Sequence, residues 1–265
     1  MDSVYTRTEL LLGKENMQKL SQSHVLVVGL GGVGGYTAEM LCRAGIGNLT
    51  IADGDAVHVS NRNRQLIALL SNEGKLKTEA FTERFHDINS EVKVEIISEY
   101  LRDDRMKEVL DAKPYDYIVD AIDTLSPKLF LLYHSYQKRL PIVSSMGSGG
   151  KLDPTMVRAV DISQTEVCPL AAIIRKKLHR MGIYSGITAV YSPEKIVENS
   201  TIEDSGTNKR STVGTISYLP PVFGCVCASV VIRGILGMQV VPKFKDKKFY
   251  QSVLNRVSEQ NGKDI

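Results

Sequence analysis

The feature that most constrains the fold of this chain is a glycine-rich hexapeptide, GLGGVG, at residues 29–34. It follows an apolar run at 24–28 and leads into residues 33–44, which have the pattern of a helix that ends near Gly45. Glycines in this arrangement let the backbone approach a phosphate, and the N–H groups at the start of the helix point at that anion. The hexapeptide therefore predicts a strand–turn–helix unit that binds a nucleotide, with a glycine turn used only for packing as the alternative.

The alternation of strands and helices continues to residue 145. The predicted strands are 24–28, 48–53, 93–100, 115–120 and 141–145, and the predicted helices between them are 33–44, 73–88, 102–111 and 126–138. Repeated alternation of this kind is typical of a doubly wound, mostly parallel sheet. The expected fold class is therefore α/β, with a Rossmann-like sheet.

The pattern changes in the C-terminal half, where we expect an additional strand and helix elaboration. Its predicted elements are a strand at 155–161, a helix at 169–181, a strand at 187–191, a mobile polar loop at 192–211 and a last helix at 222–238. No break in composition marks a second independent domain. We therefore expect one domain over residues 1–265, with a nucleotide-binding half at 1–150 and a substrate-side half at 151–265.

Composition and charge mainly exclude other classes of protein. The 265 residues include 33 Lys and Arg against 30 Asp and Glu, so a nucleic-acid surface would have to be a local patch. The four cysteines form no C-x-x-C pair, so we expect no zinc, and their sparsity fits a reducing compartment. The apolar stretch at 222–241 contains Arg233 and three glycines, which favours a buried helix over a membrane span. The N-terminus lacks an apolar signal core, and we expect a cytoplasmic protein.

Asp53 lies at the end of the second predicted strand, 19 residues beyond Gly34. This is the usual place for a carboxylate that binds the hydroxyl groups of a ribose. A turn is the alternative, because residues 53–55 read Asp-Gly-Asp. Up to this point in the chain, NAD and ATP are equally good ligands.

Polar and basic residues soon after this carboxylate favour ATP. Asn61, Arg64 and Lys77 could contact a triphosphate, which carries more charge than the pyrophosphate of NAD and favours Arg and Lys. A solvated basic face is the alternative for these residues. Asp123 follows the fourth predicted strand and could hold Mg²⁺, which prefers carboxylate and phosphate oxygens. Capping of the next helix is the alternative for Asp123.

Taken together, these motifs resemble those of the ThiF/MoeB/HesA superfamily, which is related to ubiquitin-activating enzymes. The matching segments are residues 29–34 (GLGGVG), 45–50 (GIGNLT), 53–55 (DGD), 60–65 (SNRNRQ), 74–77 (GKLK) and 120–123 (DAID). The resemblance implies that the chain binds ATP and Mg²⁺ and adenylates a carboxylate. The nucleotide-binding residues that it implies are Gly29, Gly31, Gly32, Gly34, Asp53, Asp55, Asn61, Arg64, Lys77 and Asp123, with Asp123 as the metal ligand.

The same resemblance implies a homodimer. In that superfamily an N-terminal arginine reaches the ATP of the partner subunit, and Arg7 occupies the corresponding place here. The catalytic residues implied by the resemblance are then Arg7, Arg64, Lys77 and Asp123.

The C-terminal half is similar to tRNA threonylcarbamoyladenosine dehydratases at residues 147–155, 160–162, 168–171 and 214–221. This similarity implies ATP-dependent dehydration, by cyclisation, of N6-threonylcarbamoyladenosine next to the anticodon of a tRNA, through an acyl-adenylate. Some members of this branch have a cysteine, with a proposed role in sulfur relay, where this chain reads YLPP at 218–221. A sulfur-transfer partner is therefore left open. Cys225 and Cys227 lie in an apolar helix and are expected to be buried and inert.

The surface that would bind tRNA and several rival functions remain open at this point. The candidate basic segments are 175–180, 209–210 and 243–248, each with a solvated face as the alternative. The main rival is an enzyme that adenylates the C-terminus of a ubiquitin-like or sulfur-carrier protein. An NAD-dependent oxidoreductase and a non-catalytic nucleotide sensor are the others.

Overall fold

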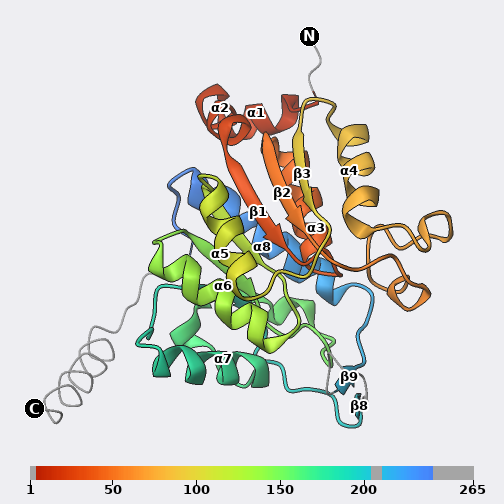
Figure 1. Ribbon diagram of the computed structural model, residues 1–265, viewed down its shortest axis with the longest axis vertical. Coiled ribbons are helices and arrows are strands. Elements are labelled where there is room, and N and C mark those ends of the chain that lie inside the picture. The colour runs from red at the N-terminus through yellow and green to blue at the C-terminus, as the bar shows by residue number, and fades with distance from the viewer. Residues whose placement is uncertain (1–3, 204–210, 241–265) are drawn as a thin grey trace, which may run out of the picture.

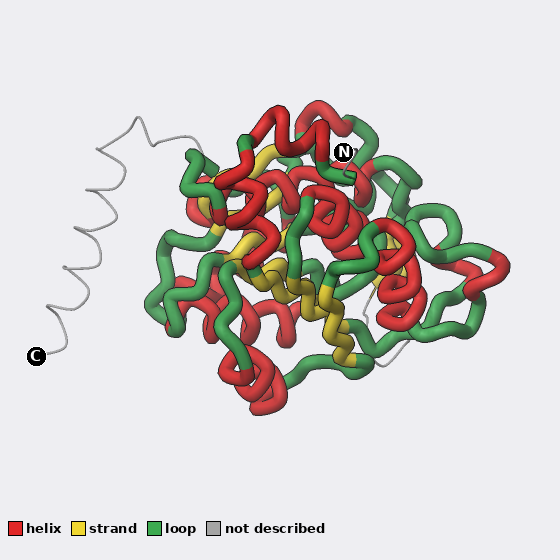
Figure 2. Tube along the Cα trace, turned by 90° about the horizontal axis from the view of Figure 1, so that it is seen from above, coloured by secondary structure: helices red, strands yellow, loops and turns green. Residues whose placement is uncertain are grey.

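A computed structural model describes residues 4–203 and 211–240, which contain a seven-stranded sheet between two layers of helices (Figure 1). The order of the strands is β3-β2-β1-β4-β5-β7-β6, and every neighbouring pair is parallel except β6 with β7. Seen from above, the sheet runs between the helices (Figure 2). The strands are β1 (His24–Val28), β2 (Asn48–Ala52), β3 (Lys93–Ile97), β4 (Tyr117–Asp120), β5 (Ile142–Ser145), β6 (Arg158–Asp161) and β7 (Thr188–Tyr191), with β8 (Thr201–Glu203) and β9 (Ser211–Val213) in a separate hairpin.

Each face of the sheet has its own hydrophobic core. One core includes Leu41 of α3, Phe81 of α4 and Phe223 of α8, and the other includes Met106 of α5, Leu131 of α6 and Ile174 of α7. The helices are α1 (Thr6–Leu12), α2 (Lys14–Gln22), α3 (Gly34–Ala44), α4 (Lys77–Ile88), α5 (Asp103–Ala112), α6 (Leu125–Gln137), α7 (Pro169–Arg180) and α8 (Leu219–Ile235). Helices α3, α4 and α8 thus cover one face of the sheet, and α5, α6 and α7 cover the other. A parallel sheet with helices on both faces is a doubly wound sheet. The predicted fold class is confirmed.

The structure also differs from the predictions. The helix predicted at 73–88 begins at Lys77, the last helix covers Leu219–Ile235 in place of 222–238, and the strand predicted at 93–100 ends at Ile97. Helices α1 and α2 were not predicted, and they lie at the amino edge of the sheet, where Leu20 O accepts the N–H of Gly47. The predicted loop at 192–211 is wrong in part, because residues 201–203 within it form β8 and pair with β9, which begins at Ser211, while 204–210 lies outside the described residues. The strand predicted at 155–161 is shorter, because Pro154 begins a 3₁₀ turn that Asp153 caps.

Helix α8 begins with Pro220 and Pro221 in its first turn and packs into the core against α3. Within the described residues, no helix is both long enough and apolar enough to cross a membrane. Cys227 is buried as predicted, and burial raises the pKa of its thiol to about 12. The prediction for Cys225 is wrong, because that residue is exposed. Two residues along a helix turn the side chain by about 200°, so these cysteines point to opposite sides.

Candidate active site

The glycine loop lies at the carboxyl edge of the sheet, between β1 and α3. Gly29 has a φ of +91°, its N–H donates to Ala52 O at 2.8 Å, and a β-carbon there would lie 2.7 Å from Ala121 O. A β-carbon on Gly34 would lie only 1.7 Å from Gly29 O. Glycine is therefore required at both positions by the packing of the loop itself.

Gly31 differs from these two glycines, because its surroundings leave room for a side chain. A β-carbon there would meet nothing closer than the Nε2 atom of Gln65, at 3.7 Å. The Oε1 atom of Gln65 is buried and has no hydrogen-bond partner among the described residues. Since buried polar groups are normally paired, this amide and the space over Gly31 fit a ligand with hydrogen-bonding groups. The sequence analysis gave Gln65 no role, although it lies in one of the matched motifs.

The contrast between these glycines gives a direct test of nucleotide approach. We expect Gly31→Ala to leave the unfolding temperature unchanged and to weaken ATP binding at least about tenfold, because the motif predicts that the backbone approaches the phosphates of the nucleotide at this glycine. Gly34→Ala should instead destabilise the fold. Isothermal titration with ATP and thermal unfolding of both variants measure these effects. Unchanged ATP affinity in Gly31→Ala would contradict the predicted approach.

Asp53 ties the glycine loop to the turn after β2. Its Oδ2 accepts the N–H of Leu30 at 2.6 Å, and its Oδ1 accepts the N–H of Asp55 at 2.8 Å. The buried ammonium of Lys77, at the start of α4, lies 3.4 Å from Asp53 Oδ1 and 2.7 Å from Asp55 Oδ2. The structure thus brings together three predicted ligands, and it pairs Lys77 with carboxylates, which the sequence analysis did not foresee. Contacts of Asp53 with ribose and of Lys77 with phosphate stay predictions.

Tyr100 is a neighbour of this cluster that the sequence analysis missed. Its hydroxyl donates to Asp55, and its ring lies so close to Gly54 that a β-carbon there would approach within 2.9 Å. The hydrogen bond to Asp55 is the main reason why the pKa of Tyr100 rises to about 12. Tyr100 therefore stays a protonated donor beside the acidic turn at neutral pH.

The segment at 58–65 carries Asn61 and brings Arg64 to the glycine loop. Asn61 Oδ1 accepts the N–H of His58 at 3.1 Å and so caps a short 3₁₀ helix. Arg64 donates from Nη1 to Ser60 O at 2.9 Å, and its own carbonyl oxygen would lie 3.3 Å from a β-carbon on Gly32. The structure therefore places this segment against the glycine loop, while phosphate contacts of Asn61 and Arg64 remain predictions.

The segment at 120–124 completes this edge of the sheet. Ala121 donates its N–H to Val28 O at 2.9 Å and touches Gly29, so the segment lies against the glycine loop. Asp123 is exposed two residues further on, and the N-cap position of α6 is taken by Thr124. A single carboxylate at this place fits Mg²⁺, which combines one or two protein carboxylates with the phosphates of a substrate.

Arg7 is the one predicted site residue that the structure does not bring to this edge within a single chain. It lies on α1. Tyr5, two residues before it in the chain, donates from its hydroxyl to Cys42 O, near the end of α3. The glycine loop lies at the other end of α3, and 11 residues of helix span about 16 Å. A role of Arg7 at the site of a partner subunit stays a prediction.

Comparison with known proteins identifies the family of the chain. A model of the ThiF family matches residues 5–262. The chain belongs to the ThiF family. Its ThiF-family relatives include the tRNA threonylcarbamoyladenosine dehydratase of Bacillus subtilis strain 168, which is 33% identical over 251 residues, or 92% of this chain and 98% of that protein. The dehydratase of Escherichia coli K12 is 36% identical over 197 residues, which are 72% of this chain and 73% of that one.

Solved structures of ThiF-family proteins confirm the fold. The crystal structure of the E. coli dehydratase TcdA in complex with ATP matches this chain with a TM-score of 0.80 at 32% identity, covering 88% of this chain and 93% of that one. The TM-score against the complex of the same enzyme with AMP is also 0.80. These findings confirm the resemblance that the motifs indicated, both to the family and to its dehydratase branch.

Proposed function

We propose that this chain is an ATP-dependent enzyme that removes water from N6-threonylcarbamoyladenosine in tRNA. The observation that carries the proposal is the convergence of three loops, at 29–34, 58–65 and 120–124, on the carboxyl edge of the sheet. Open α/β sheets bind their ligands at that edge. The convergence occurs in a chain similar to the B. subtilis dehydratase over 98% of that protein's length, which supports the tRNA substrate.

The proposed reaction has two steps. When bound, ATP supplies an α-phosphorus that the threonine carboxylate of the modified nucleoside attacks, and pyrophosphate leaves. An internal nucleophile of the same modification then attacks the activated carbonyl, closes a ring and expels AMP, so the net change is the loss of water. The first step takes place between the modified nucleoside and ATP, and the second takes place within the nucleoside. No cysteine of the chain is therefore needed as a covalent carrier.

The protein's own residues would position the reactants and offset charge. The N–H groups at the start of α3 would face the phosphates, and Asp53 would hold the ribose. Arg64 and Lys77 would donate to phosphate oxygens, and Lys77 would exchange part of its contact with Asp55 for them. Asp123 would hold Mg²⁺ between the protein and the phosphates.

The proposal is tested by incubating the pure protein with Mg²⁺, ATP and tRNA that carries threonylcarbamoyladenosine, and weighing the nucleosides after mild digestion. We expect the nucleoside to lose one water, only with ATP and not with the Arg64→Ala variant. Bound ATP together with an unchanged nucleoside would overturn the tRNA substrate. Pyrophosphate exchange stimulated by a ubiquitin-like or sulfur-carrier protein would then support adenylation of a protein C-terminus instead.

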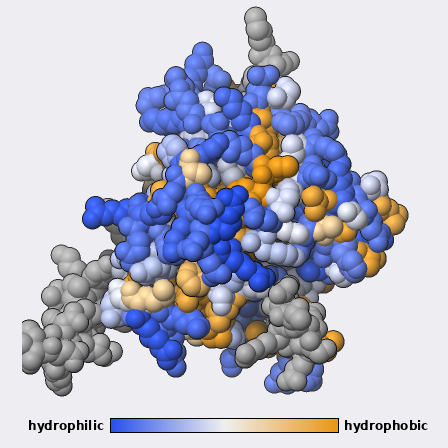
Figure 3. All heavy atoms as spheres, in the orientation of Figure 1, coloured by the Kyte–Doolittle hydropathy of each residue, from blue (hydrophilic) through white to orange (hydrophobic). Residues whose placement is uncertain are grey.

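We propose further that the enzyme acts as a homodimer, because Arg7 lies too far from the site of its own chain. Leu10 and Leu11 on the same helix are 84% and 82% exposed, and Leu70 is 80% exposed. Residues 58–76 form a lobe beside α4, at the right of Figure 1, and hydrophobic surface is visible on that side in Figure 3. Exposed apolar side chains of this size suit a contact between subunits.

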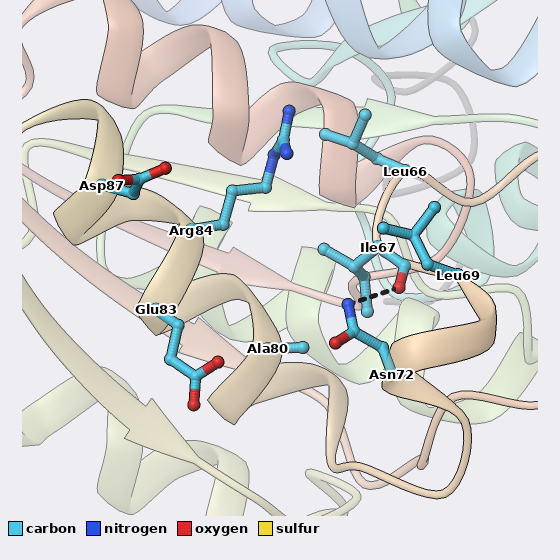
Figure 4. A pocket seen from close by; sticks show the side chains of 8 residues that line it. All are labelled: Leu66, Ile67, Leu69, Asn72, Ala80, Glu83, Arg84 and Asp87. Carbon is cyan, nitrogen blue, oxygen red and sulfur yellow. Dashed lines mark hydrogen bonds between the residues drawn. The ribbon is translucent and has the colours of Figure 1, made fainter.

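A groove beside that lobe offers a place for such a contact. It has a volume of about 340 Å³ and lies between residues 66–72 and helix α4 (Figure 4). Leu66 and Ile67 line it from the lobe, where Asn72 Nδ2 donates to Ile67 O at 3.0 Å. Arg84 lines it from α4 and is held by Glu39 of α3, with 2.7 Å between Nε and Oε2. The groove thus has a rigid wall close to the loop that carries Arg64.

For the tRNA we propose the basic side of α7. A hollow of about 450 Å³ on this side is lined by Arg175, Lys176, His179, Arg180 and Tyr184. Arg175 is held in place there, because it donates to Thr165 O at 2.7 Å. The first turn of α7 lies beside Gly147, just after β5, so the helix runs away from the carboxyl edge. Backbone phosphates of an anticodon stem would meet this surface while its loop reaches the site. The segments at 209–210 and 243–248 lie outside the described residues.

Removing two of these charges should weaken tRNA binding and its dependence on salt. Each lost phosphate contact lowers the slope of log K against log salt by about 0.7–0.9, so a Lys176→Ala/Arg180→Ala variant should lose roughly 1–2 in slope. Its affinity for ATP should not change. The matched control is Lys14→Ala/Lys19→Ala on α2, which should keep the wild-type slope. An unchanged slope in the α7 variant would exclude this surface.

A further inference from the structure

An ion pair is buried directly behind the segment that carries Asp123. The side chains of Asp120, the last residue of β4, and Lys128, in the second turn of α6, are both fully buried. Lys128 Nζ lies 2.8 Å from Asp120 Oδ2, which also accepts the hydroxyl of Ser144 at 2.6 Å. The sequence analysis gave neither charged residue a role of its own.

Stability alone does not explain such a pair. Removing an ammonium and a carboxylate from water costs several kcal/mol each, and well-packed apolar side chains often serve equally well or better. A buried ion pair of this kind instead restricts geometry, since each group binds only where its partners lie. The question is therefore which part of the chain this pair holds in place.

The pair holds the peptide groups on both sides of Ile122. The N–H of Ile122 donates to Asp120 Oδ1 at 3.1 Å, and the C=O of Ile122 accepts from Lys128 Nζ at 3.0 Å. The next residue is Asp123. Asp120 and Lys128 thus fix the backbone immediately before the proposed magnesium ligand, from a strand on one side and a helix on the other.

The same pair aligns this segment with the glycine loop. Ala121 lies between Asp120 and Ile122 in the chain. Its carbonyl oxygen is so close to Gly29 that a β-carbon on Gly29 would lie 2.7 Å from it. A shift of Ile122 would therefore move either Asp123 or the contact between the two loops. Because the side chains of Asp120 and Lys128 are fully buried, they could not follow such a shift by rotating.

We infer that Lys128 is a positioning residue, which, with Asp120, sets the direction in which Asp123 presents its carboxylate to the Mg²⁺–phosphate group of bound ATP. This inference rests on the proposed function for the identity of that group. Lys128 does not itself contact substrate, and Ser144 from β5 steadies the Asp120 carboxylate. Loss of Lys128 should therefore alter the use of Mg²⁺ even in a protein that is fully folded.

The test compares two variants. Lys128→Met leaves the Asp120 carboxylate buried and unpaired, and it should lower the unfolding temperature. The double variant Asp120→Asn/Lys128→Met removes both charges and keeps similar volumes, so it should recover most of that stability while the donor to Ile122 O stays absent. Thermal unfolding with and without ATP, at several Mg²⁺ concentrations, and the rate of AMP formation with modified tRNA are measured for each.

We expect the double variant to need several times more Mg²⁺ for half of the ATP-induced rise in unfolding temperature. Its kcat should fall by roughly 100-fold, the loss typical of a reacting group misplaced by about 1 Å. The matched control is Asp161→Asn at the end of β6, which disturbs another carboxylate that holds backbone groups, the N–H of Ser163 at 2.9 Å and the N–H of Gly186 at 2.7 Å. That variant should lose stability and keep the wild-type Mg²⁺ requirement.

A stable double variant with wild-type kcat and Mg²⁺ requirement would overturn the inference, because the pair would then be structural only. If the wild-type protein forms no AMP with modified tRNA, the proposed substrate is wrong. The Mg²⁺-dependent shift in unfolding temperature still decides the inference in that case, since it needs only ATP.

Discussion

Asp123→Asn is expected to lower the rate of AMP formation by roughly 10²–10³-fold, the usual cost of losing one group that stabilises charge in the transition state. The change keeps the shape of the side chain and removes its charge, so Mg²⁺ would be held less firmly on the phosphates. Because Asp123 is exposed, the unfolding temperature should stay close to that of the wild type. The rate is measured with modified tRNA over a range of Mg²⁺ concentrations.

Raised Mg²⁺ should recover part of the activity of Asp123→Asn, since weaker binding is offset by concentration. The control is Asp104→Asn on α5, an exposed carboxylate paired with Lys107 at 2.8 Å, which should behave as the wild type. A full rate in Asp123→Asn at low Mg²⁺ would show that another group holds the metal. A loss that no Mg²⁺ concentration changes would instead assign Asp123 a role without metal.

Arg7→Ala should be inactive alone and active again when mixed with Asp123→Asn. If Arg7 acts on the site of the partner subunit, a mixed dimer has one site with both defects and one site with neither. Random exchange of subunits then restores about a quarter of the wild-type activity, because half of the dimers are mixed and each has one intact site. The measurement is AMP formation after the two pure variants are unfolded and refolded together.

Two matched controls make this result decisive. Arg64→Ala mixed with Asp123→Asn should gain nothing if both residues belong to the same chain's site, which their common loop contacts indicate. Lys14→Ala, on the adjoining helix α2, should be fully active alone. If Arg7→Ala is inactive and mixing restores nothing, Arg7 does not act across subunits, and a fully active Arg7→Ala would remove it from the catalytic set.

Much of the fold could be predicted because its signals lie close together in the chain. The strand at 24–28 was predicted with the bounds that the structure has, from an apolar run that stops at glycine. The carboxyl-edge residues Asp53 and Asp123 were predicted because a parallel sheet brings the ends of its strands to one edge. Helices α1 and α2 were missed, since short helices with few buried residues have weak periodicity; α1 buries none and α2 only Leu20.

Local sequence therefore determined the type and order of the elements, the glycine turn and the edge at which a nucleotide would bind. Only the tertiary structure decided which side chains meet there: Lys128 with Asp120, Tyr100 with Asp55, and Gln65 over Gly31. It also decided that Cys225 is exposed and that Arg7 lies at the far end of α3. The reason is that backbone propensities depend on neighbours within a few residues, whereas the partner of a buried charge depends on packing between segments. Asp55 and Tyr100, for example, are 45 residues apart in the chain.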